Sequence, residues 1–205
     1  MIHTVDSTTK ASTPGQIQIS KSKYLDYLAL TGITRFKYYH LLSISQDTLF
    51  KFFSSNEIIF DFIQKTEQFK YGCLNPTIVI DKKEGIIATF TNLTSYGKKI
   101  TPVIKISIEP LHLIKNIDVK NGQKLPTVAL YTRNLENEYA NAWTDFDPKI
   151  ANCFTDDINA CGKLLLRVSE NAWKCLDEGL KQIDNNKKAG LYHINLATDL
   201  VRSAY

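Results

Sequence analysis

The chain has 205 residues, of which 43% are hydrophobic and 22% charged, enough for one packed domain with an ordinary polar surface. No stretch approaches the roughly 18 uninterrupted apolar residues that cross a bilayer, so no membrane partner is expected. The net charge of +4 is thinly spread, with 8 basic and 6 acidic side chains in residues 1–70, 9 and 6 in residues 71–140, and 8 and 9 in residues 141–205, which gives no support for a dedicated nucleic-acid binder.

Residues 1–16 are rich in Ser and Thr and are predicted to be a disordered tail, without the basic start and apolar run of a secretory signal. Residues 17–70 are predicted to form a mixed helical and β layer. Ser20 can cap a short helix that Gly32 ends, and residues 33–44 alternate in polarity as a strand does. Ser54 and Glu57 form a capping box, which predicts the start of an aromatic helix that packs on the rest of the fold.

Residues 71–133 are predicted to form the β core of the protein. Short apolar runs alternate there with turn signals such as Lys82-Lys83-Glu84-Gly85 and Asn121-Gly122, where glycine tolerates a positive φ. The expected strands cover residues 74–80, 86–91, 103–108, 111–119 and 127–131. About five strands without a long crossover between them predict an antiparallel meander or a small closed barrel.

Residues 134–205 are predicted to be a loop followed by a long amphipathic helix that packs on the core. Thr155 with Asp156 and Asp157 is a favourable helix start, and apolar residues recur at helical spacing as far as Ile183. The predicted fold is therefore α+β, a small antiparallel β-barrel or bent sheet flanked by N-terminal aromatic helices and a long C-terminal helix, all in one compact unit.

The four cysteines at positions 73, 153, 161 and 175 contain no Cys-x-x-Cys pair. Cys161 and Cys175 would lie about 21 Å apart on one straight helix, too far for a disulfide. Reduced thiols in a cytoplasmic protein are the simplest interpretation. Cys73 at the start of a strand could act as a nucleophile, but no histidine lies near it in sequence, and burial is the commoner role of a free cysteine.

Two further clusters carry candidate binding residues. Trp143, Asp145 and Asp147 precede Pro148, and the two carboxylates could bind a cation or share acid–base work. A turn anchored by aromatic side chains is the favoured alternative. Arg35, Lys37 and Tyr39 belong to a segment that mixes cations and aromatic rings, as a base-stacking platform does. The alternation of that segment favours a half-buried strand instead.

Several segments resemble an uncharacterised family of bacterial proteins known as a domain of unknown function. They include Gly72-Cys73-Leu74-Asn75-Pro76, Leu125-Pro126-Thr127-Val128-Ala129-Leu130-Tyr131, Trp143-Thr144-Asp145-Phe146-Asp147-Pro148 and Gly190-Leu191-Tyr192. The resemblance spans residues 70–192. It implies a bacterial, cytoplasmic protein, and it transfers no activity and no site residues.

The sequence lacks a P-loop, a dinucleotide-binding glycine motif, a Gly-x-Ser-x-Gly elbow and a His-Glu-x-x-His pair. The leading hypothesis is a non-catalytic module that binds a protein or a small ligand, without a cofactor or a metal. The alternatives are an enzyme that uses Asp145, Asp147 and Cys73 in a cleft, and weak nucleic-acid binding through Arg35, Lys37 and the lysines of the β core.

Overall fold

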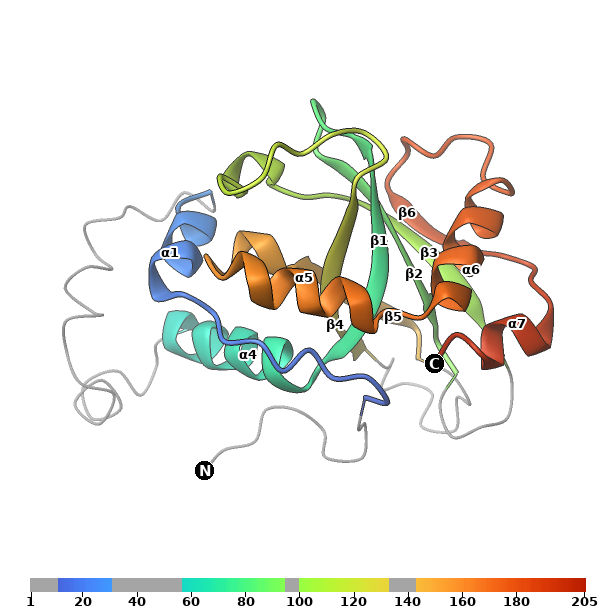
Figure 1. Ribbon diagram of the computed structural model, residues 1–205, viewed down its shortest axis with the longest axis horizontal. Coiled ribbons are helices and arrows are strands. Elements are labelled where there is room, and N and C mark those ends of the chain that lie inside the picture. The colour runs from blue at the N-terminus through green and yellow to red at the C-terminus, as the bar shows by residue number, and fades with distance from the viewer. Residues whose placement is uncertain (1–10, 31–56, 95–99, 133–142) are drawn as a thin grey trace.

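The computed structural model describes residues 11–30, 57–94, 100–132 and 143–205 of the chain (Figure 1). Within these residues, six antiparallel strands form one sheet in the order β5-β4-β1-β2-β3-β6. Their bounds are β1 Cys73–Asp81, β2 Ile86–Asn92, β3 Pro102–Ile108, β4 Lys124–Thr132, β5 Asp145–Ile150 and β6 Gly190–His193. The α+β class with a curled antiparallel sheet, predicted from the sequence, is therefore confirmed.

Four of the five predicted strands correspond to β1, β2, β3 and β4. Gly85 and Gly122 have φ values of 71° and 78°, so both predicted turns use glycine in the left-handed region. The fifth prediction, a strand over residues 111–119, is wrong. The segment is a 3-10 turn, Leu111–Leu113, followed by a loop, and its apolar side chains enter the core without pairing to a neighbouring strand. A short apolar run cannot by itself distinguish these two outcomes.

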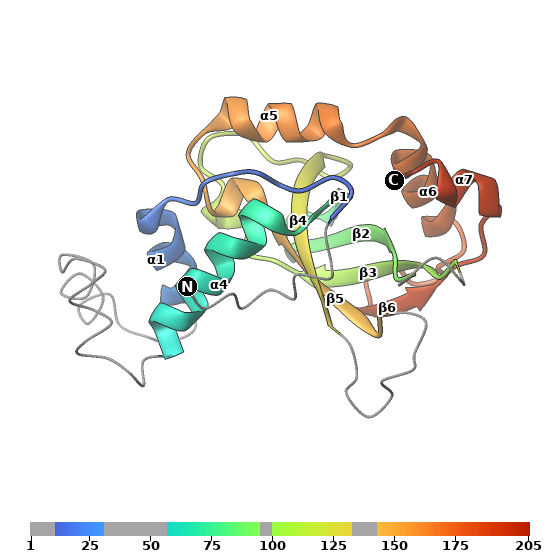
Figure 2. The same cartoon turned by 90° about the horizontal axis from the view of Figure 1, so that it is seen from below.

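The sheet is strongly curled, as Figure 2 shows. Three strands lie between β3 and β5 in the sheet order, yet Lys105 Nζ on β3 donates to the carbonyl oxygen of Phe146 on β5 at 2.6 Å. Thr77, Thr89 and Thr127 are fully buried on neighbouring strands. The Thr77 hydroxyl lies 2.7 Å from that of Thr89 and 2.8 Å from that of Thr127. The curl is thus stabilised by buried hydrogen bonds as well as by apolar contacts.

Helices α1, Lys21–Ala29, and α4, Glu57–Tyr71, precede the sheet. Tyr24 and Leu25 of α1 and Phe69 of α4 are buried in one apolar cluster with Phe154 and Val128. The strand predicted over residues 33–44 and the capping box at Ser54 lie outside the described residues. α4 has the aromatic character that the sequence predicts for the helices before the sheet. Its Phe62 packs against Tyr24 of α1, with ring centroids 4.9 Å apart.

Part of the segment predicted as a disordered tail is packed against the fold. The N–H of Gly15 donates to the carbonyl of Gly72 at 3.0 Å, and the N–H of Leu74 donates to the carbonyl of Thr13 at 2.9 Å. Arg167 also donates from its guanidinium to the carbonyl of Gly15 at 3.1 Å. The prediction is therefore wrong for residues 13–16, where backbone pairing with the start of β1 fixes the chain. Residues 1–10 lie outside the described part.

The single C-terminal helix predicted from Thr155 to Ile183 is two helices, α5 Ile158–Arg167 and α6 Glu170–Leu180. Val168 between them is extended, with φ −73° and ψ 122°, and Ser169 caps the second helix. Cys161 and Leu164 of α5 pack with the α1 and α4 cluster, whereas Cys175 and Leu176 of α6 pack with α7, Thr198–Arg202. The bend lets two short helices cover different parts of a curled sheet that one straight helix could not follow.

We expect Ser169→Ala to lower the free energy of unfolding by roughly 1–2 kcal/mol. The Ser169 hydroxyl accepts from the N–H of Ala172 at 3.1 Å and donates to the carbonyl of Ala204 at 2.8 Å, so the variant loses both the α6 cap and a tie to the C-terminal residues. Urea unfolding followed by circular dichroism measures the change. Ser169→Asp, which keeps a capping acceptor and lacks the donor, should lie between the two proteins.

Candidate functional site

Strand β5 carries its charged side chains on one face. Asp145, Asp147 and Lys149 alternate along the strand with Phe146, Pro148 and Ile150, and side chains two apart in a strand share a face. Phe146 and Ile150 are buried in the core. The segment interpreted from sequence as an anchored turn is thus an edge strand with a charged face, and Pro148 is compatible with an edge because its ring nitrogen donates no ladder hydrogen bond.

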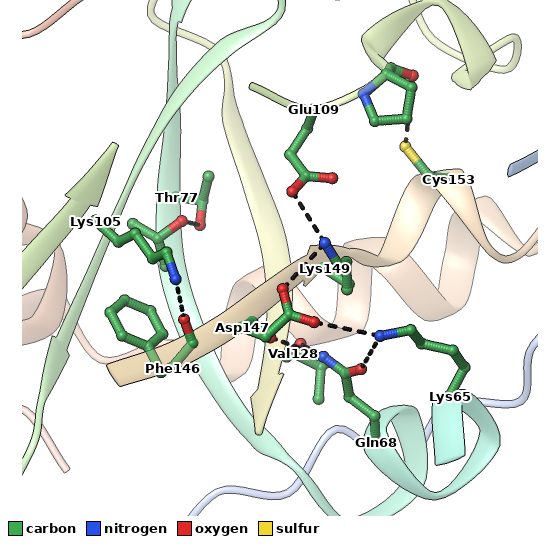
Figure 3. A network of polar contacts seen from close by, with 12 residues as sticks. Lys65, Gln68, Thr77, Lys105, Glu109, Val128, Phe146, Asp147, Lys149 and Cys153 are labelled. Atoms are coloured by element: carbon green, nitrogen blue, oxygen red, sulfur yellow. Dashed lines mark hydrogen bonds and ion pairs between the residues drawn. The ribbon is translucent and has the colours of Figure 1, made fainter. Parts of the chain in front are cut away.

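Lys149 is the centre of the charged cluster on β5 (Figure 3). Its Nζ lies 3.3 Å from Oε1 of Glu109 and 3.0 Å from Oδ1 of Asp147. The side chains of Lys149 and Glu109 are only 13% and 6% exposed, so both charges are largely removed from water. Burial lowers the pKa of Lys149, but the nearby Glu109, Asp147 and Tyr27 raise it by more, and the net pKa lies above its ordinary value. Lys149 therefore stays charged.

Glu109 is the most buried carboxylate of the cluster. Burial raises its pKa, and the adjacent Lys149 lowers it by less, so the net pKa is above the ordinary value. A carboxylate in this position depends on its lysine, because an isolated charge in a low-dielectric environment is very unfavourable.

Helix α4 contributes a lysine and an amide to the same cluster. Lys65 Nζ lies 3.2 Å from Oδ2 of Asp147 and 3.2 Å from Oε1 of Gln68. The fully buried Gln68 donates from Nε2 to the carbonyls of Val128 and Asp147, at 2.9 and 2.8 Å. Figure 3 shows both side chains directed from α4 toward β5, so the contacts attach the helix to the edge of the sheet.

A second ion pair joins the two sides of the curl. Lys105 Nζ lies 2.9 and 3.0 Å from the two carboxylate oxygens of Asp145 and also donates to the carbonyl of Phe146. Oδ1 of Asp145 in turn accepts from the N–H of Phe146 at 2.7 Å. Side chains therefore occupy polar backbone groups of the edge strand, which protects such an edge from pairing with another chain.

We expect the acid stability of the protein to depend on Asp147. Burial raises the pKa of Asp147, but Lys149 and Lys65 together lower it by more, so the net pKa lies below the ordinary value of 3.8. A carboxyl group with a depressed pKa in the folded state stabilises the protein above its unfolded pKa, and this contribution is lost as the pH falls through the folded pKa. Asp147→Asn should therefore weaken the pH dependence of the unfolding free energy below about pH 4, as urea titrations over that range would measure.

The cysteines are not poised for nucleophilic chemistry. Burial raises the pKa of the Cys73 thiol to about 11, and a hydrogen bond with Tyr131 lowers it by less. The pKa values of Cys153 and Cys161 are raised to about 12 and that of Cys175 to about 11, each chiefly by burial. Because the thiolate is the reactive form, these thiols are expected to react slowly near neutral pH.

The residues singled out in the sequence analysis are only partly brought together. Asp145 and Asp147 share a face of β5 but pair with different lysines. Trp143 packs beside Tyr131, with ring centroids 6.0 Å apart, in the small cluster that includes Phe146. Cys73 lies beside Tyr131, and neither carboxylate is among the groups that shift its pKa. Arg35, Lys37 and Tyr39 lie outside the described residues and remain predictions.

Sequence reasoning missed Lys65, Lys105 and Lys149, which pair with the two carboxylates. It also missed Gln68 and Glu109, which contact Lys65 and Lys149. A local signal existed for Lys149 alone, since the alternation of Asp-Phe-Asp-Pro-Lys-Ile is that of a half-buried strand. Each carboxylate in this network has a lysine partner, and among the described residues no group of three or more His, Cys, Asp and Glu side chains could hold a metal ion. The network is suited to fixing α4, β3 and β5 relative to one another.

The outer face of α5 has a different character. Six large apolar side chains of the described residues are exposed, and α5 is the element among them that carries two, Ile158 at 48% and Leu166 at 87%. With Gly162 and the half-buried Leu165 they follow the i, i+4, i+7, i+8 spacing of one helix face. We call Ile158, Gly162, Leu165 and Leu166 the α5 stripe. An exposed apolar group of this kind is typical of an interaction surface.

None of the helices in the described residues combines the length and the apolar composition required to cross a membrane. A crystal structure described as that of a "putative membrane protein" from Corynebacterium diphtheriae matches part of the chain, with 17% sequence identity and a TM-score of 0.48. That similarity covers 59% of this chain and 99% of the other. No curated protein matches the chain.

A family model described as "Protein of unknown function (DUF3239)" matches residues 62–184, from within α4 to just after α6. The expected membership in a family of unknown function is thereby confirmed, while the shared motifs, the bacterial origin and the cytoplasmic location stay predictions. With the matched region spanning most of the sheet together with α5 and α6, this chain belongs to the DUF3239 family.

Proposed function

We propose that this protein is a non-catalytic interaction module that binds another protein chain through the α5 stripe. The observation that carries the proposal is the exposure of Leu166, 87% of whose surface is open to water, on the same helix face as Ile158. Burying a leucine side chain fully contributes about 1.5–3 kcal/mol. A partner that covers the stripe therefore stabilises the complex relative to the free chain.

The rest of the molecule supports a binding role over chemistry. The carboxylates of β5 are occupied by Lys65, Lys105 and Lys149, and the thiols have raised pKa values. The ion pairs join the two sides of the curled sheet and attach α4 to it, and Leu164 of α5 packs in the same buried cluster as Val128 of β4. A rigid, preorganised surface loses less entropy on association than a mobile one.

A photoreactive phenylalanine analogue at position 166 tests the proposal in cells. We expect a covalent adduct of defined mass that weakens when Ile158→Glu is introduced into the same chain. The analogue at Lys174, an exposed position of α6, is the matched control. Adduct formation at 166 that does not exceed the control, or that is unaffected by Ile158→Glu, would overturn the proposal. Turnover of a substrate that is lost in Asp147→Asn but retained in Lys174→Ala would favour the enzyme alternative instead.

A further inference from the structure

Strands β1 and β2 separate at one end of their pairing. The last paired residues at that end are Thr77 and Thr89, although both strands extend beyond them. The Asn75 side chain spans the separation, since its amide nitrogen donates to the carbonyl of Phe90 at 3.3 Å and to the hydroxyl of Thr91 at 2.9 Å. We call Asn75, Phe90 and Thr91 the β1–β2 split.

The side chain of Tyr205 occupies the β1–β2 split. Its ring stacks on Phe90, with ring centroids 6.2 Å apart. Its hydroxyl lies 3.3 Å from Oγ1 of Thr91 and 3.5 Å from Nδ2 of Asn75, and both distances are at the long end of the hydrogen-bond range. The structure therefore shows which chemical group the split accepts, a phenol held by one aromatic face and two polar side chains.

Tyr205 leaves the hydrogen bonding of the split incomplete. Asn75 is fully buried, and its Oδ1 has no hydrogen-bond partner in the described residues. Its Nδ2 carries two hydrogens, but four oxygen atoms lie within hydrogen-bond distance of it, those of Phe90, Thr91, Tyr131 and Tyr205. Turning the amide over would place Oδ1 against the carbonyl oxygen of Phe90. Because a buried polar atom without a partner is unfavourable, the split is imperfectly matched to its tyrosine.

The Tyr205 side chain can leave the split while the backbone stays in place. The preceding Ala204 is buried, and its carbonyl accepts from the Ser169 hydroxyl at 2.8 Å. Tyr205 itself is 40% exposed, so rotation about its side-chain bonds carries the ring into water. Rotamer changes of exposed side chains are much faster than unfolding.

From these features we propose that the β1–β2 split is a binding site for a phenolic ligand, and that Tyr205 fills it from within the same chain when no ligand is bound. The split shares no residue with the α5 stripe, so this inference is independent of the proposed function.

Titration of the full chain carrying Tyr205→Ala with p-cresol, the free form of a tyrosine side chain, is the primary test. At about ten times its Kd, p-cresol should raise the midpoint of thermal unfolding by about 3–6 °C. The parent should bind p-cresol at least about tenfold more weakly, because Tyr205 competes for the site. Toluene, which lacks the hydroxyl, should bind Tyr205→Ala more weakly than p-cresol does. Tyr71→Ala, which removes a tyrosine of similar exposure, 46%, is the matched control and should respond as the parent does.

The parent chain gives a second test that needs no vacated site. With carbon-13 in the tyrosine rings, excess p-cresol should move the Tyr205 resonance toward that of free tyrosine and leave the Tyr71 resonance unchanged. Loss of one resonance in Tyr205→Phe assigns it. A Tyr205 resonance that does not move, or p-cresol that stabilises Tyr205→Ala no more than Tyr71→Ala, overturns the site. Equal affinities of toluene and p-cresol overturn its preference for a phenol.

Discussion

Replacing Lys149 with methionine is expected to lower the free energy of unfolding by about 3–5 kcal/mol, the cost of removing one member of a buried ion pair. The variant would leave Glu109, with 6% of its side chain exposed, as a charge without its lysine in an apolar setting. Asp147 would keep its contact with Lys65, so most of the loss should come from Glu109. Urea unfolding of both proteins at neutral pH measures the difference.

A second substitution separates the charge from the packing. Adding Glu109→Gln to Lys149→Met removes the buried charge and keeps a polar side chain of similar shape, so we expect the double variant to recover part of the lost stability. Lys82→Met is the matched control at a surface pair, where Lys82 and Asp118 are 53% and 70% exposed. Such exposed pairs contribute little to stability. A loss in Lys149→Met no larger than in Lys82→Met would show that the cluster does not stabilise the fold.

The β core was predictable because its signals are local. Strand β1 and strand β2 are short apolar runs joined by a turn in which Gly85 needs a positive φ, and both the runs and the turn can be read within a dozen residues. The helix break at Val168 and Ser169 was missed for the converse reason. The helical spacing of apolar residues continues across this break. The bend follows from the curl of the sheet, which the sequence of the helix does not indicate.

The ion network was not predictable in the same way. Lys65 lies on α4, Lys149 on β5 and Glu109 in the loop just after β3. They have no common motif, so only the curl and the docking of α4 bring them together (Figure 3). The Asp-Phe-Asp-Pro segment of β5 carried a misleading signal, since aspartate before proline is typical of a turn. The segment is a strand instead, because Lys65, Lys105 and Lys149 neutralise carboxylates that would otherwise be unfavourable on a half-buried strand.

We expect Gly72→Ala to destabilise the protein by roughly 3 kcal/mol or more, at the upper end of what overpacking costs. Gly72 is the single residue between α4 and β1. A Cβ on it would lie 2.5 Å from the carbonyl oxygen of Gln68 and 2.7 Å from that of Ala129. Both are backbone atoms, so relief requires movement of the helix end or of β4. Thermal and urea unfolding would measure the loss.

Gly162→Ala is the matched control, and we expect its effect to have the opposite sign. Alanine is favoured over glycine within a helix by up to about 1 kcal/mol, and the new methyl group at this position meets open space. The same chemical change thus distinguishes a glycine required by close backbone approach from one that the monomer does not require. Equal stabilities for Gly72→Ala and the parent would mean that α4 can move away from β4 at little cost. The new side chain would displace the backbone carbonyl of Gln68, whose side chain attaches α4 to β5. Equal stabilities would therefore also contradict the importance of that attachment.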